Sequence, residues 1–114
     1  MLTPDSPSVT VLSVAGWWFA SSLGKSVELT HERREHILEY HADVLPYLDR
    51  LADVLAHPDE LRRSLSDSET VLFYKHYPDI RSGKYMVAVV KVGEERCFVL
   101  TAYLTQTTRT GMPL

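Results

Sequence analysis

The second half of the chain has the composition of extended segments. Three stretches, residues 70–77, 84–92 and 96–105, are rich in β-branched and aromatic residues, and short turns containing Gly83 and Gly93 separate them. Short connections cannot make the crossover that parallel neighbours require. The pattern therefore predicts an antiparallel meander of three strands.

The middle of the chain has helical character. Thr30 is a suitable N-cap, and Glu32 and Glu35 place carboxylates where they suit the positive end of a helix dipole. Pro46 disfavours helical geometry at the residue before it, so we expect a break within residues 42–45 and then a second helix of about ten residues. Apolar residues recur at helical spacing in this second segment: Tyr47, Leu48, Leu51, Ala52, Val54 and Leu55.

Two further segments complete the predicted architecture. Residues 8–20 are rich in Val, Trp and Phe and predict a bent strand or loose hairpin, with residues 27–29 returning beside it. We expect residues 60–63 to add one helical turn. The two helices must cover one face of the sheet to bury their apolar stripes, which predicts an α+β fold.

Length and charge limit the classes of function. With 114 residues and a net charge of −3, the chain is expected to be a single domain, 1–114, and not a general polyanion-coating protein. Residues 1–60 hold four Lys and Arg against ten acids, whereas residues 61–114 hold eight against five. The second half either presents a basic face or has the ordinary composition of strands.

Cysteine usage and the N-terminus indicate the compartment. Cys97 is the only cysteine, which excludes an internal disulfide and a cysteine zinc cluster and favours a reducing environment. The N-terminus lacks the positive start of a secretory signal, and the apolar stretch 9–20 is short for a membrane span. We therefore expect a cytoplasmic protein with no membrane association.

His31, His36 and His41 form a conspicuous series with a spacing of five. At about 100° per residue, each successive histidine of an unbroken helix is displaced by roughly 140°. The three would then spread around the helix, so we expect neither a metal site nor another cofactor. His41 is interpreted either as a core histidine or as a general acid or base, since the ordinary pKa of histidine, about 6.5, suits proton transfer near neutral pH.

Hydroxyl groups line one side of the last predicted strand. With a period of two, Thr101, Tyr103 and Thr105 project from one face. This face is either an ordinary solvent-facing surface or part of a site. Tyr74-Lys75-His76 on one neighbouring strand and Lys91 on another would add positive charge to such a site if the register permits.

Residues 29–37, Leu-Thr-His-Glu-Arg-Arg-Glu-His-Ile, resemble the "LTxERxxHI" opening of bacterial and phage-associated domains of the barnase–EndoU–colicin–RelE (BECR) class. Phe73-Tyr74-Lys75 is similar to the aromatic-aromatic-base strand of these domains, and residues 85–90 and 99–105 are similar to their "YLVVVV" and "VITAYLT" strands. Arg109 and Gly111 match a trailing base and glycine. The resemblance covers about residues 27–111 and leaves 1–26 as an N-terminal extension.

This resemblance implies two N-terminal helices packed on an antiparallel sheet of about four strands, as in RelE-like proteins. It also implies a metal-independent endoribonuclease, toxin-like or associated with a mobile element, whose partners would be RNA and a protein inhibitor or antitoxin. By position, the catalytic residues would be His36, His41, Lys75, Thr101 and Tyr103. The histidines would act as base and acid, Lys75 and Thr101 would bind the phosphate, and Tyr103 would orient the RNA.

The substrate-binding residues on this reading are Arg33, Tyr74, Thr105 and Arg109. For Arg33 the alternative to phosphate binding is a salt bridge with Glu32, Glu35 or Asp43.

Two other functions are compatible with the sequence. One is a non-catalytic module that binds RNA, a nucleotide or a protein on the same scaffold. The other is a homodimer formed through Trp17, Trp18 and Phe19, although these aromatic residues are equally compatible with ordinary strand packing.

Overall fold

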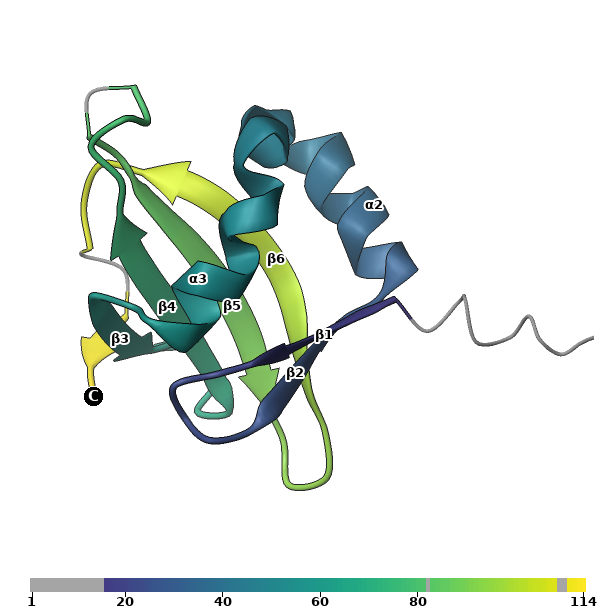
Figure 1. Ribbon diagram of the computed structural model, residues 1–114. Coiled ribbons are helices and arrows are strands. Elements are labelled where there is room, and N and C mark those ends of the chain that lie inside the picture. The colour runs from purple at the N-terminus through teal and green to yellow at the C-terminus, as the bar shows by residue number, and fades with distance from the viewer. Residues whose placement is uncertain (1–15, 82, 109–110) are drawn as a thin grey trace, which may run out of the picture.

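The computed structural model describes residues 16–81, 83–108 and 111–114 (Figure 1). The helical segments are α2 (His31–Tyr40), the 3-10 helix η1 (Ala42–Arg50) and α3 (Leu51–Ala56). The strands are β1 (Trp17–Ala20), β2 (Ser26–Leu29), β3 (Glu60–Arg63), β4 (Thr70–His76), β5 (Tyr85–Val92), β6 (Cys97–Thr105) and β7 (Met112–Pro113).

All seven strands belong to one mixed sheet in the order β1-β2-β6-β5-β4-β3-β7. The β2–β6 pair is parallel, and the other pairs are antiparallel. The prediction of two helices on an antiparallel sheet of about four strands is therefore wrong. The sequence analysis missed β3, which was expected to be a helical turn, because the short polar segment Glu60–Arg63 becomes a strand only through its pairing with β4.

The predicted meander is present, and so is the part of the predicted N-terminal hairpin that the structure describes; residues 8–15 of that prediction lie outside the described residues. Strands β4, β5 and β6 lie within the three predicted ranges and pair in sequence. Strand β2 returns beside β1, with Trp17 opposite Leu29. The N-terminal hairpin is thus one edge of the same sheet as the meander.

A β-bulge interrupts β6. Val89 pairs with Thr101 and Val90 with Val99, so Leu100 is an extra residue without a partner on β5. The bulge shifts the alternation by one residue. As a result Val99 and Ala102, on either side of the bulge, both belong to the main core.

That main core lies between the helices and one face of the sheet, here called the helix face. The helices contribute Ile37, Val44, Leu51, Val54 and Leu55, and the meander contributes Val71, Phe73, Met86, Ala88, Val90, Val99 and Ala102. The chain leaves the helical path at His41, one residue before the predicted break at residues 42–45. The predicted second helix is divided between the 3-10 helix η1, which includes Pro46, and α3. No described helix is both long enough and apolar enough to span a bilayer.

The opposite face of the meander, here called the open face, has a smaller core. Leu72, Tyr74 and Val87 are buried there. Tyr85, Val89 and Tyr103 are half-buried and pack against them. After β6 the chain crosses to the edge of the sheet opposite β1, where β7 pairs with β3. Arg62 Nη1 donates a hydrogen bond to Gly111 O there, at 3.0 Å.

Candidate functional site

Helix α2 lies beside the C-terminal half of β6 (Figure 1). The register of the β2–β6 pair is Glu28 opposite Phe98, at the other end of β6. Arg33 connects the helix to the strand, because its Nε and Nη2 atoms donate to Leu100 O at 2.8 and 2.6 Å. The guanidinium group thus binds the main chain at the bulge instead of the acidic side chains considered in the sequence analysis.

The end of α2 brings two histidines together. The helix ends at Tyr40, and His41 is its C-cap, with φ −138° and ψ 54°. Because the backbone leaves the helical path at this residue, the rings of His36 and His41 lie 6.4 Å apart, inclined at 63°. The expectation that the histidines spread around the helix fails for this pair, because it assumed an unbroken helix. His31, at the start of α2, contacts Trp17 instead.

Tyr103 on β6 lies beside this histidine pair, His36 and His41. The His41 and Tyr103 rings are 5.8 Å apart, and all three side chains are half-buried. Thr101 precedes Tyr103 on the same face of β6, and its Oγ1 is buried without a hydrogen-bond partner in the described part of the chain. Four of the five predicted catalytic residues therefore lie on α2, its C-cap and the adjacent half of β6.

The fifth, Lys75, lies elsewhere. It is opposite Met86 on the helix face, where its Nζ donates to His57 O at 2.8 Å and lies 3.9 Å from Asp59 Oδ1. The prediction that Lys75 joins the histidines is wrong, because strand alternation places it on the same face as Phe73. Lys91 is opposite Phe98 and pairs with Asp67 at 2.6 Å, so it adds no charge beside Thr101 or Tyr103 either.

Further aromatic side chains extend from Tyr103 across the open face. Tyr85 is on the neighbouring strand and diagonal to Tyr103, whose direct partner is Val87. His76 is opposite Tyr85, with the two rings 5.1 Å apart. Tyr103, Tyr85 and His76 are called the aromatic row below. The sequence analysis placed His76 beside the hydroxyl face only on condition of strand register, and it missed Tyr85, because one sequence does not reveal register.

Two predicted substrate-binding residues lie next to this row. Tyr74 is fully buried and contacts the Tyr85 ring edge-to-face at 6.2 Å, so it supports the row from beneath. Thr105 is half-buried and opposite Tyr85. Of the other two, Arg33 binds Leu100 O as described above, and Arg109 lies outside the described residues.

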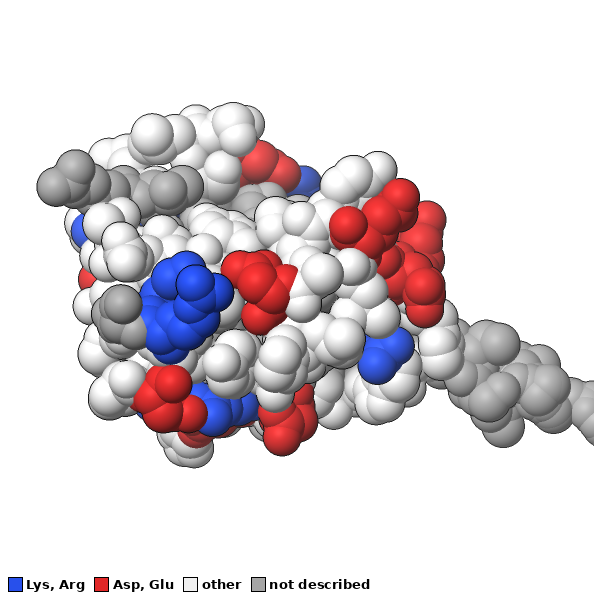
Figure 2. Space-filling model, turned by 90° about the horizontal axis from the view of Figure 1, so that it is seen from above, with Lys and Arg blue, Asp and Glu red and all other residues white. Residues whose placement is uncertain are grey.

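Charge is distributed unevenly around these groups. The outer side of α2 and the first turn of η1 expose Glu32, Glu35, Glu39 and Asp43, and Figure 2 shows acidic side chains gathered on the side where α2 lies. At the other end of the aromatic row, the β4–β5 connection carries Arg81 and Lys84. Neither forms an ion pair with another described residue.

The two largest pKa shifts, those of Asp67 and Tyr77, lie outside this site. The Lys91 ammonium donates to Asp67, which also accepts from the Glu69 N–H and the Thr70 hydroxyl, and these bonds lower the pKa of Asp67 to about 2. Burial and the hydrogen bond to Asp53 Oδ2, at 2.6 Å, raise the pKa of Tyr77. Both pKa shifts arise from contacts that hold the fold together, and neither group belongs to the site around His41 and Tyr103.

Within residues 16–81, 83–108 and 111–114, no group of three or more His, Cys, Asp or Glu side chains is placed to hold a metal ion. Comparison with known proteins gives no further assignment, because no family model, no curated protein and no solved structure matches this chain.

Proposed function

We propose that this chain is a metal-independent endoribonuclease of the BECR type that uses the histidine pair as its general acid and base. The observation that carries the proposal is the approach of His36 and His41 to each other and to Tyr103. The centroids of the two imidazole rings are 6.4 Å apart, so both rings lie close enough to contact the same phosphodiester, one as base and the other as acid.

The reaction would be an in-line transfer within the RNA chain. One imidazole takes the proton of the ribose 2′-hydroxyl, the 2′-oxygen attacks the adjacent phosphorus, and the bond from phosphorus to the 5′-oxygen breaks. The other imidazole, in its protonated form, gives its proton to the departing 5′-oxygen. The products are a 2′,3′-cyclic phosphate and a 5′-hydroxyl.

The neighbouring side chains would bind the substrate. Tyr103 and Tyr85 present half-buried rings, and His76 an exposed one, on which unpaired bases can stack. The Thr101 hydroxyl is buried and has no partner among the described residues, so the proposed bond to a phosphate oxygen requires the neighbouring side chains to move aside.

Charge would determine the direction from which RNA approaches. Arg81 and Lys84 attract phosphates at the β4–β5 end of the aromatic row. The acidic side of α2 repels them, so the RNA crosses the sheet and does not pass over the helix. A cytoplasmic location and a protein inhibitor that covers the histidine pair are also part of this proposal.

The test is cleavage of a labelled single-stranded RNA in the presence of EDTA between pH 5 and 9. We expect the wild-type protein to give a bell-shaped pH profile, because base and acid must be in opposite protonation states. His36→Ala and His41→Ala should each lower the rate by about 10²–10⁴-fold. His57→Ala is the matched control, since His57 is exposed and outside the histidine pair, and it should cleave at the wild-type rate.

Absence of cleavage by the wild-type protein at every pH contradicts the proposal. If RNA binding is retained under those conditions, the alternative of a non-catalytic binding module replaces it. Cleavage that persists in both histidine variants also contradicts it, since another group would then carry the chemistry.

A further inference from the structure

Strand β1 is an unusual sheet edge. It has a pairing partner on one side only, β2, among the described residues. Its sequence, Trp-Trp-Phe-Ala, contains no charge and no proline, the devices that normally prevent an edge strand from pairing with another chain. Trp17 and Trp18 remain 40% and 58% exposed, so this edge presents large apolar groups together with main-chain groups that pair with no second described strand.

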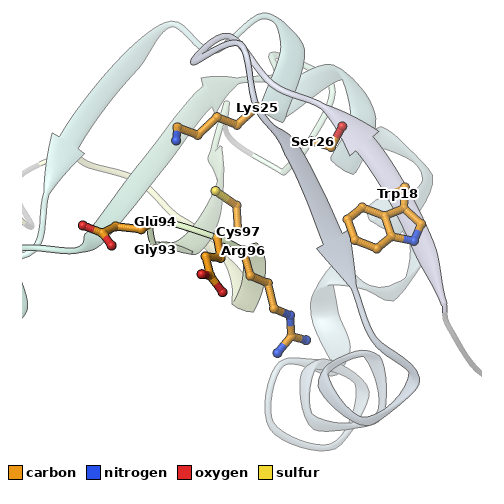
Figure 3. Close-up of a pocket in the computed structure, with 8 residues that line it drawn as sticks. Trp18, Lys25, Ser26, Gly93, Glu94, Arg96 and Cys97 are labelled. Atoms are coloured by element: carbon orange, nitrogen blue, oxygen red, sulfur yellow. The ribbon is translucent and has the colours of Figure 1, made fainter.

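The two faces of β1 border two different cavities. Trp17 and Phe19 lie on the helix side, where they line a cavity of about 300 Å³ with Leu48, Arg34 and Asp49. Trp18 lies on the other side and borders a cavity of about 310 Å³ with Lys25, Glu94, Glu95 and Arg96. Figure 3 shows Trp18 on β1 and Arg96 on the β5–β6 connection, with the β2 ribbon between them.

We propose that β1 is a self-association edge, at which two copies of this chain join their sheets through antiparallel β1–β1 pairing. Directly opposite residues of an antiparallel pair share a face of the sheet. If Trp18 is opposite Trp18 of the second copy, then Trp17 of each copy is opposite Phe19 of the other, and both of these pairs lie on the helix side. This register pairs all three aromatic residues, whereas centring the axis on Phe19 leaves Trp17 without an aromatic partner.

The charges that flank β1 favour a second copy over a charged peptide. Arg34 and Asp49 lie on the helix side, and Lys25 and Arg96 lie with Glu94 and Glu95 on the other side. The Trp18 side also carries Glu28, which is opposite Trp18 and pairs with Arg96 at 3.2 Å. The two sides together therefore hold three positive and four negative groups, and two identical edges meet with only a small excess of like charge. A two-fold interface is self-complementary in this sense. A strongly acidic or basic segment would gain nothing from these flanks.

The test is the molar mass in solution, measured by light scattering over a dilution series of the full chain. We expect a monomer–dimer equilibrium with a Kd on the order of 10 µM, because short strands bury less area than the roughly 1,600 Å² of a standard interface. Trp18→Glu and Trp18→Arg should each be monomeric, since like charges then face each other across the axis. An equimolar mixture of the two variants should form dimers again, because the opposed charges attract.

Leu65→Glu serves as the control, since Leu65 is 75% exposed and lies outside β1, and this variant should dimerise like the wild type. A wild-type monomer at concentrations of about 200 µM, well above that Kd, overturns the proposal. Dimerisation by Trp18→Glu alone, or a mixture of the two folded variants that stays monomeric, also overturns it. The proposal is independent of the ribonuclease activity, and the mass measurement does not depend on cleavage.

Discussion

The two faces of the meander use the same strands for different purposes. On the helix face, Val71, Phe73, Met86, Ala88 and Val90 are all at most 5% exposed. On the open face, residues that alternate with these on the same strands form a small buried cluster bordered by aromatic and polar side chains that reach the solvent. The comparison teaches that the helix-face residues of the meander serve the main core, whereas the open face combines a small buried cluster with side chains that remain accessible to solvent.

Helix α2 is the part of the molecule that joins the two faces. Ile37 belongs to the main core on the helix face, whereas His41 contacts Tyr103, which packs on the open face. A helix beside β6 can contribute to both, because it lies along the edge of the meander. The histidine pair reaches the open face for this reason.

The largest expected effect distinguishes the two faces directly. Phe73→Ala should lower the free energy of unfolding by about 3–5 kcal/mol, because it removes a fully buried ring and leaves a cavity. Tyr85→Ala, on the adjacent strand but on the open face, should cost about 1 kcal/mol, because its ring is half-buried. Urea denaturation of both variants measures the difference, and equal losses would refute the distinction between the faces.

A smaller effect is expected where α2 meets β6. Arg33→Lys should lower the free energy of unfolding by about 1–2 kcal/mol, because an ammonium group cannot reproduce the paired donation to Leu100 O. It should also slow RNA cleavage, because the helix then holds the histidines less firmly against Tyr103. Arg34→Lys is the control, since Arg34 lies over the Trp17 ring instead. Identical behaviour of the two variants would show that Arg33 does not position the site.

A comparable loss of stability is expected when a polar contact at the helix-face core is removed. Tyr77 packs against the helix-face core, and its hydroxyl donates to Asp53 at 2.6 Å. Tyr77→Phe should cost about 1–2 kcal/mol near neutral pH. Since the folded-state pKa of Tyr77 is raised, this contribution is complete below the ordinary tyrosine pKa of about 10 and decreases as the pH rises above it. Thermal unfolding of both proteins across this range checks the sign.

The smallest effect is expected for Asp67, which pairs with Lys91 beside the open face. Its pKa is lowered from 3.8 to about 2. The contribution to stability is therefore present above about pH 4 and is lost as the pH falls towards 2. Asp67→Asn should lower the melting temperature slightly at pH 7 and not at pH 2. A difference that is unchanged at pH 2 would show that the ion pair is not its cause.

The sequence predicted the elements that depend on local pattern. The meander follows from runs of β-branched and aromatic residues, and the start of α2 follows from Thr30, whose side chain accepts from Arg33 N. It did not predict β3 or β7, because these short strands exist through pairing with distant residues. Nor did it predict the parallel β2–β6 contact, which brings together segments about 70 residues apart.

The candidate site was predicted in part for similar reasons. His36, His41, Thr101 and Tyr103 came from motif positions, and they lie on adjacent elements. Lys75 came from the same reasoning but faces the opposite way, because the resemblance carries no information about strand register in this chain. His36 and His41 are in contact because α2 ends at Tyr40 and His41 is no longer helical. The sequence did not show that the helix would end before His41.

The five histidines provide the most direct test that the histidine pair and the aromatic row form one RNA-binding surface. The measurement is an NMR titration of the imidazole C–H signals with a single-stranded RNA whose 2′-hydroxyl groups are methylated, so that it binds without being cleaved. The account predicts that the signals of His36, His41 and His76 move together, while those of His31 and His57 stay in place. Signals of His36 and His41 that do not move at saturating RNA, or movement confined to His31 or His57, would contradict it.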